Sequence, residues 1–299
     1  MDAVLTLVAA PDVHLESSTV DRVRDALSTL GADSGAVDWL APARACDLPF
    51  QGVVPDQADA AARLALGGAR VDVIAQNGAD RKKRLLVADM ESTIIHQEML
   101  DELGEMVGLG GRIAEITRRA MNGEIDFKGA LRERVGLLAG LPESALDEAY
   151  QRVEFMPGAR ALVQTMRASG ARCVLVSGGF RAFTRRVAAT AGFHEEYGND
   201  LEIVDGTVSG RTLEPILDRE SKAALLIQTA TAHQIPIQAV LAVGDGANDL
   251  PMLMMAGLGV AFRAKPSVAA AARTRLDHAD LTGLLYAQGY RLADILNPA

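Results

Sequence analysis

Three short apolar segments, each ending in a polar cluster, constrain the fold of this chain more than any other feature. They are "RLLVAD" at 84–89, "ARCVLVSGG" at 171–179 and "AVLAVGDGAND" at 239–249, and helical patterns separate them. Continuous apolar segments of this length are typical of strands buried on both faces. Because strands and helices alternate, we expect a parallel α/β sheet with helices on both sides and ligands bound at the carboxyl ends of the strands.

Two further regions flank the first of these strands. Residues 97–155 show helical patterns and no strand pattern, with breaks at a glycine-rich stretch, 108–111, and at Asn122-Gly123, and they predict a helical insertion. Residues 1–80 show strand and helix patterns in the order βαββαβ, which predicts a ferredoxin-like unit. The segment "NGADRKKR" at 77–84 has turn residues and solvated charges, as a linker would. We therefore expect two domains, at 1–80 and 84–299.

Composition excludes several classes of protein. A net charge of −9 and a pI of about 5.1 argue against binding of a nucleic-acid backbone but allow a small anionic substrate in a pocket with a few cations. Two isolated cysteines argue against a disulfide framework, and the five histidines show no metal-ligand spacing. Because no basic leader or long apolar stretch occurs, we expect a cytoplasmic protein without a membrane partner.

The strand ends carry residues suited to phosphoryl transfer. Asp89 directly follows a strand, where a carboxylate can attack phosphorus, and Glu91 can serve as the general acid and base. Asp245 and Asp249 offer hard oxygen ligands for Mg²⁺, which would neutralise the charge of the phosphoryl group. The alternative is that the acids in "DMEST" only cap the next helix.

Two other motifs are ambiguous when taken alone. Ser177 with the amides of Gly178 and Gly179 can hold phosphate oxygens, but "SGG" is also an ordinary turn sequence. Lys222 can pair with phosphate, although a lone lysine is far more often a surface residue. The order of these motifs along the chain, each placed at a strand end or helix start, favours a common site.

Taken together, "DMEST", "SGG", "SK" and "GDGAND" resemble the four ordered motifs of haloacid dehalogenase superfamily phosphatases. The resemblance covers about 84–285, and "HQEMLDELG", "RRAMNGEIDFKGALRERV" and "FMPGA" narrow it to the phosphoserine phosphatases of that superfamily. It implies a Rossmann-like sheet with a helical cap, Mg²⁺ as cofactor, and hydrolysis of O-phospho-L-serine through an aspartyl-phosphate. The βαββαβ unit is similar in element order to ACT-type regulatory domains, which implies an L-serine effector or a homodimer.

The resemblance also implies a role for each matching residue. Asp89 would be the nucleophile and Glu91 the acid and base. The metal would be held by Asp89, the carbonyl of Glu91, and Asp245, with Asp249 in support. The substrate-binding residues would be Glu98 for the amino group, Arg134 for the carboxylate, Met121 and Phe127 as pocket walls, and Ser177, Gly178, Lys222 and Asn248 for the phosphate.

One departure from the family pattern concerns Glu91, since that motif normally has aspartate there. The additional methylene moves the carboxyl group, and a misplacement of about 1 Å can cost about 100-fold in rate. One alternative that follows is a sensor that binds phosphoserine without turnover. Two others keep the mechanism: another small amine-bearing phosphomonoester as substrate, or transfer of phosphate to an acceptor alcohol.

Overall fold

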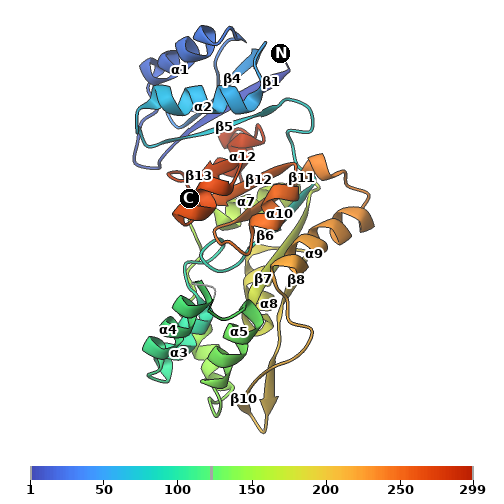
Figure 1. Cartoon of the computed structure of the whole chain (residues 1–299). Coiled ribbons are helices and arrows are strands. Elements are labelled where there is room, and N and C mark those ends of the chain that lie inside the picture. The colour runs from blue at the N-terminus through green and yellow to red at the C-terminus, as the bar shows by residue number, and fades with distance from the viewer. Residues whose placement is uncertain (1, 122–123, 298–299) are drawn as a thin grey trace.

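A computed structural model gives the fold and describes residues 2–121 and 124–297, with the side chain of Met121 outside the described part. The molecule is elongated, with an N-terminal unit at one end, a central sheet in the middle and a group of helices from residues 99–150 at the other end (Figure 1). Within the described ranges, no helix is both long and apolar enough to cross a membrane.

The central sheet confirms the predicted parallel α/β architecture. Its strand order is β13-β12-β11-β6-β7-β8, and every neighbouring pair is parallel. The strands are β6 (Leu85–Ala88), β7 (Arg172–Phe180), β8 (Glu195–Asn199), β11 (Val240–Gly244), β12 (Leu258–Phe262) and β13 (Thr274–Leu276).

Side chains of β6 alternate between two cores, as expected of a strand buried on both faces. Leu86 and Ala88 pack in one core with α7 (Ala159–Ala168) and α8 (Arg181–Ala191). Leu85 and Val87 pack in the other, with the helices on the opposite face, α9 (Arg219–Ala232), α10 (Leu250–Met255) and α11 (Pro266–Ala271). A 3₁₀ turn, η1 (Ile237–Ala239), leads into β11.

The N-terminal unit has the order βαβββαβ on an antiparallel sheet, which is the predicted βαββαβ order with one additional two-residue strand, β2. Its strand order is β2-β4-β1-β5, and β3 is also paired with β4. Its elements are β1 (Ala3–Ala9), α1 (Ser17–Thr29), β2 (Asp33–Ser34), β3 (Asp38–Ala41), β4 (Ala45–Gln51), α2 (Pro55–Leu66) and β5 (Val71–Asn77). Leu5 and Leu7 of β1 pack against both helices, whereas Val8 joins the larger core that it shares with the central domain.

The segment between this unit and β6 differs from the solvated linker that the sequence predicts. Arg81 lies 2.6 Å from Asp47 and donates to the carbonyl of Ala287 at 2.9 Å, and Lys83 is only 6% exposed. Buried Asp72 on β5 accepts the backbone N–H groups of residues 277, 278 and 279 at 2.7–3.0 Å. The charged residues are therefore anchors: Arg81 joins Asp47 of the N-terminal sheet to the carbonyl of Ala287, and Lys83 donates to the carbonyl of Gln238.

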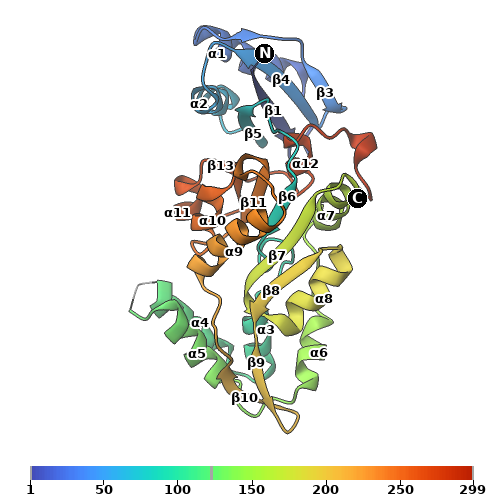
Figure 2. The same ribbon diagram turned by 90° about the vertical axis from the view of Figure 1, so that its right-hand side faces the viewer.

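These anchors fix the N-terminal sheet to the C-terminal part of the chain. That part contains α12 (Gly283–Ala287) and the 3₁₀ turn η2 (Leu292–Asp294). Arg44, next to β4, donates to Asp280 at 2.6 Å. Figure 2 shows α12 directly below the N-terminal sheet.

The predicted helical insertion is present as α3 (Met99–Met106), α4 (Gly110–Met121), α5 (Phe127–Gly136) and α6 (Ser144–Tyr150). The break at 108–111 lies between α3 and α4, and the break at Asn122-Gly123 falls outside the described residues. Ile95 and Phe155 pair where the chain enters and leaves this cap.

Residues 201–212 are not part of the parallel sheet. They belong to a separate antiparallel hairpin, β9 (Leu201–Val204) and β10 (Thr207–Thr212). Asp205 and Gly206 both have positive φ, as the central residues of a two-residue hairpin turn require. The hairpin lies along α5 of the cap in both ribbon views (Figures 1 and 2).

Candidate active site

Three carboxylates meet where β6 and β11 end. Asp89 follows β6 and Asp245 follows β11, and the two strands are neighbours in the sheet. One oxygen from each of Asp89, Asp245 and Asp249 lies within 4.8 Å of the others. Carboxylate oxygens gathered in this way suit a hard cation such as Mg²⁺, so the residues present fit the metal that the sequence predicts.

Lys222 joins this cluster from α9 and is no surface residue. It is 1% exposed, and its Nζ lies 2.8 Å from Asp89 Oδ1 and 2.7 Å from Asp249 Oδ1. Burial acts to lower the pKa of Lys222, but Asp249 and Asp89 outweigh it and raise that pKa. The lysine is therefore a buried ammonium ion. The other oxygen of Asp249 accepts the N–H of Gly246 at 2.9 Å, so both oxygens of this carboxylate already have partners.

One ammonium ion does not balance the three carboxylates. Burial raises the pKa of Asp89 well above its usual value, Asp249 raises it further, and Lys222 opposes both. Burial and Asp249 also raise the pKa of Asp245 to about 6, although Thr93 Oγ1 donates to it at 3.2 Å. Excess negative charge in a buried site favours binding of a cation.

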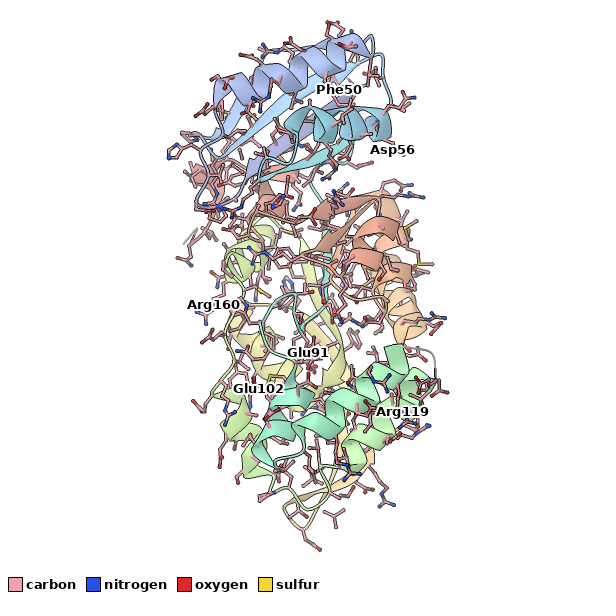
Figure 3. All side chains as sticks on the ribbon, turned by 60° about the vertical axis from the view of Figure 1, so that its left-hand side comes forward. Phe50, Asp56, Glu91, Glu102, Arg119 and Arg160 are labelled. Carbon is pink, nitrogen blue, oxygen red and sulfur yellow. The ribbon has the colours of Figure 1, made fainter. Side chains whose placement is uncertain are left out.

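Glu91 lies between the central sheet and the cap (Figure 3). Its Oε1 accepts the N–H of Met99, the first residue of α3, at 2.9 Å. A Cβ built on Gly179 of β7 would lie only 2.8 Å from Oε2 and 2.9 Å from Oε1, so the carboxyl group touches the end of β7. Burial, and then the charge of Glu98, raise the pKa of Glu91 to about 8. A carboxyl group that is protonated at neutral pH can act as a general acid.

The "SGG" residues belong to β7 itself, rather than to a turn after it. Ser177 is fully buried, and its Oγ accepts the N–H of Gly179 at 2.9 Å. The carbonyl of Gly178 accepts a hydrogen bond from Asn199 of β8 at 2.7 Å. A Cβ on Gly178 would lie 3.4 Å from Phe127 Cζ, so the cap places this ring over the end of β7.

The two charged residues predicted to grip an amino acid lie on the cap side. Glu98 is the N-cap residue of α3, and its Oε1 accepts a hydrogen bond from Ser92 at 2.7 Å. Arg134 of α5 donates to Thr117 Oγ1 of α4 and to the carbonyl of Ala130, each at 3.3 Å. Burial lowers the pKa of Arg134, while Asp101, Glu91 and Glu98 raise it, which places this guanidinium near the acids of the site.

Of the remaining predicted residues, Asn248 lies in the loop after β11 and folds its side chain over Gly246, and the side chain of Met121 is outside the described residues. Sequence reasoning missed Ser92 and Thr93, which bond to Glu98 and Asp245. Their position directly after Glu91 in "DMEST" was the available signal.

Comparisons with known proteins agree with this arrangement. The model of the haloacid dehalogenase-like hydrolase family matches residues 86–254. A phosphoserine phosphatase of Lactococcus lactis subsp. lactis is 43% identical over 203 residues, which cover 68% of this chain and 94% of that protein. The phosphoserine phosphatase SerB2 of Mycobacterium tuberculosis is 43% identical over 215 residues, which cover 72% of this chain but only about half (53%) of the relative.

A solved structure extends the similarity to the N-terminal unit. The unliganded crystal structure of a probable phosphoserine phosphatase from Vibrio cholerae is 30% identical, with a TM-score of 0.78. The superposition covers 98% of this chain and 88% of that one. Since the family model matches more than half of the sequence, this chain belongs to the haloacid dehalogenase-like hydrolase family.

Proposed function

We propose that the chain is a Mg²⁺-dependent phosphoserine phosphatase that hydrolyses O-phospho-L-serine to L-serine and phosphate. One observation carries the proposal: a buried Lys222–Asp89–Asp249 cluster lies beside a carboxyl group, Glu91, whose pKa is raised to about 8. A nucleophile and a protonated acid in one site are what hydrolysis through a covalent intermediate requires. The similarity to proteins named phosphoserine phosphatase supports this substrate.

The reaction has two balanced steps. In the first, an Asp89 oxygen bonds to phosphorus, the bond from phosphorus to the serine oxygen breaks, and Glu91 gives its proton to that oxygen. In the second, water attacks the aspartyl-phosphate, Glu91 takes a proton from the water, and phosphate leaves with Asp89 regenerated.

Other residues of the chain hold the phosphoryl group during both steps. Lys222, Ser177, Gly178 and Asn248 would bind the phosphate oxygens, and Gly179 would limit the movement of Glu91. Mg²⁺ would be held by Asp89, the carbonyl of Glu91, and Asp245, with Asp249 in support, and it would supply positive charge for the phosphoryl oxygens.

Residues of the cap would select the substrate. Glu98 would accept the ammonium group of phosphoserine, and Arg134 would pair with its carboxylate, while Phe127 and Met121 would close the pocket against water. A phosphomonoester without a carboxylate would leave Arg134 without that partner in a buried position, which costs free energy.

The test is phosphate release from O-phospho-L-serine in the presence of Mg²⁺, beside phosphoethanolamine and a phosphosugar, with Asp89→Asn as the inactive control. We expect fast turnover of phosphoserine alone and none in the control. Binding of phosphoserine without phosphate release would refute the enzymatic proposal and indicate a sensor. Phosphate that appears on an added alcohol would indicate a phosphotransferase.

We also propose that residues 1–80 form an ACT-like regulatory or dimerisation domain beside a phosphatase domain, 84–299, with its cap at about 97–155. The order of the N-terminal unit, βαβββαβ, supports this assignment, since it is the βαββαβ order with one additional two-residue strand, β2. Titration with L-serine and measurement of the mass in solution test it, since an effector domain should bind L-serine and a dimerisation domain should give twice the chain mass.

A further inference from the structure

Ser92 has an unusual backbone conformation for a residue with a side chain. Its φ is +52°, in the left-handed region, and it directly follows Glu91 in the loop after β6. The loop is tight, because the N–H groups of Ile94 and Ile95 both donate to the carbonyl of Met90, at 2.8 and 3.0 Å. A residue other than glycine in this region costs about 1 kcal/mol, and such residues cluster at functional sites.

This conformation accompanies a hydrogen bond between Ser92 and Glu98. Ser92 Oγ donates to Glu98 Oε1 at 2.7 Å. Glu98 is the N-cap residue of α3, but among the described residues its carboxylate caps no helix N–H group. Glu91 accepts the N–H of Met99, the first residue of α3, at 2.9 Å. The carboxylate of Glu98 is therefore held by Ser92, in the loop after β6, and not by the backbone of α3.

The orientation of Glu98 matters because its side chain is exposed and lies beside the proposed general acid. Glu98 directly precedes Met99, whose N–H donates to Glu91 at 2.9 Å, and it is bonded to Ser92, the residue after Glu91. A glutamate on the surface loses substantial rotamer entropy when a ligand immobilises it, and a residue that orders it beforehand removes part of that cost.

We propose that Ser92 is a positioning residue for substrate specificity, which holds Glu98 so that the other carboxylate oxygen of Glu98, Oε2, receives the ammonium group of an amino-acid phosphomonoester. This inference rests on the proposed function for the identity of the substrate and adds a residue that determines selection of the amine. Ser92 acts through Glu98 and takes no part in the phosphoryl transfer.

The experiment separates the effect of the Ser92 hydroxyl group on binding from the effect of its backbone conformation. Ser92→Ala removes the hydroxyl and keeps the backbone strain, whereas Ser92→Gly removes both, because glycine adopts positive φ freely. Ser18→Ala is the matched control, since Ser18 also donates to a glutamate, Glu16, at 3.2 Å on the surface of the N-terminal unit. All three are made in the Asp89→Asn background, and calorimetry measures dissociation constants for O-phospho-L-serine and for 3-phosphonooxypropionate, which lacks only the amine.

We expect both Ser92 variants to bind phosphoserine about tenfold more weakly, the contribution typical of a hydrogen bond to a charged group. Binding of the amine-free analogue and binding by Ser18→Ala should not change. In the active protein, which retains Asp89, both Ser92 substitutions should raise the KM for phosphoserine with little change in kcat.

Three results would overturn the inference: unchanged affinity for phosphoserine, an equal loss for the amine-free analogue, or wild-type affinity in Ser92→Gly. The last result would show that the backbone, and not the hydroxyl, matters. The calorimetric assay measures binding and needs no turnover. If the protein binds phosphoserine without hydrolysing it, the proposed function is refuted, but the calorimetry still decides the role of Ser92.

Discussion

Replacement of Gly179 by alanine tests whether contact with β7 positions Glu91 as the general acid. The new Cβ would lie 2.8 Å from Oε2, 2.9 Å from Oε1 and 3.0 Å from the carboxyl carbon of Glu91. Ordinary contacts begin near 3.4 Å, so the carboxyl group must move by about 0.5–1 Å, a displacement that costs about 10- to 100-fold in rate. We expect a fall of that size in kcat for phosphoserine.

The fold should tolerate the same substitution. Gly179 lies within β7 and is not among the glycines with positive φ, so alanine introduces no backbone strain. The atoms that must yield are the end of a flexible side chain, and the hydrogen bond from Met99 to Glu91 is worth only about 1 kcal/mol. Thermal unfolding should therefore change little. Gly111→Ala is the control, because a Cβ there meets no atom of the described residues within 4 Å.

A double-mutant cycle with Glu91→Asp shows whether the two residues act through this contact. Aspartate is one methylene shorter, so its carboxyl group withdraws from Gly179 and leaves room for the new methyl group. We expect the double variant to be no slower than Glu91→Asp alone, a strongly non-additive result. Wild-type kcat in Gly179→Ala, or losses that simply multiply in the double variant, would refute this account of Glu91.

Three further predictions concern buried polar groups. Lys222→Met leaves Asp89 and Asp249 without their buried cation, and chemical denaturation should show a loss of about 3–5 kcal/mol in the free energy of unfolding. Asp72→Ala removes the acceptor of three backbone N–H groups, and we expect a loss of about 3 kcal/mol or more, with Asp72→Asn between it and wild type in the same assay. The pKa of His194 is lowered, chiefly by burial, and its neutral ring accepts the N–H of Cys173 at 3.0 Å. The contribution of His194 to the free energy of unfolding is complete above the ordinary pKa of about 6.5 and is lost as the pH falls toward the lowered pKa. The difference in unfolding free energy between pH 7.5 and 5.5 should therefore be smaller in His194→Asn than in the wild-type protein.

The sequence by itself determined the architecture around the site. Strand and helix patterns are local, and a parallel sheet places the carboxyl ends of neighbouring strands at one edge. The sequence therefore predicts that Asp89 and Asp245 lie close together. The helical cap and all elements of the first 80 residues except the two-residue strand β2 were predictable for the same reason. The order of the motifs along the chain then indicated the family.

Tertiary structure alone decided which polar residues are buried and what they contact. Lys222 and Arg81 look like surface residues in the sequence, but one lies between two carboxylates and the other anchors the N-terminal sheet. The contacts of Glu91 with Gly179 and of Arg44 with Asp280 join residues 88 and 236 positions apart. Such pairs depend on how sheets and helices dock, and the burial that shifts a pKa or pairs a charge depends on every surrounding element, so no local pattern encodes either one.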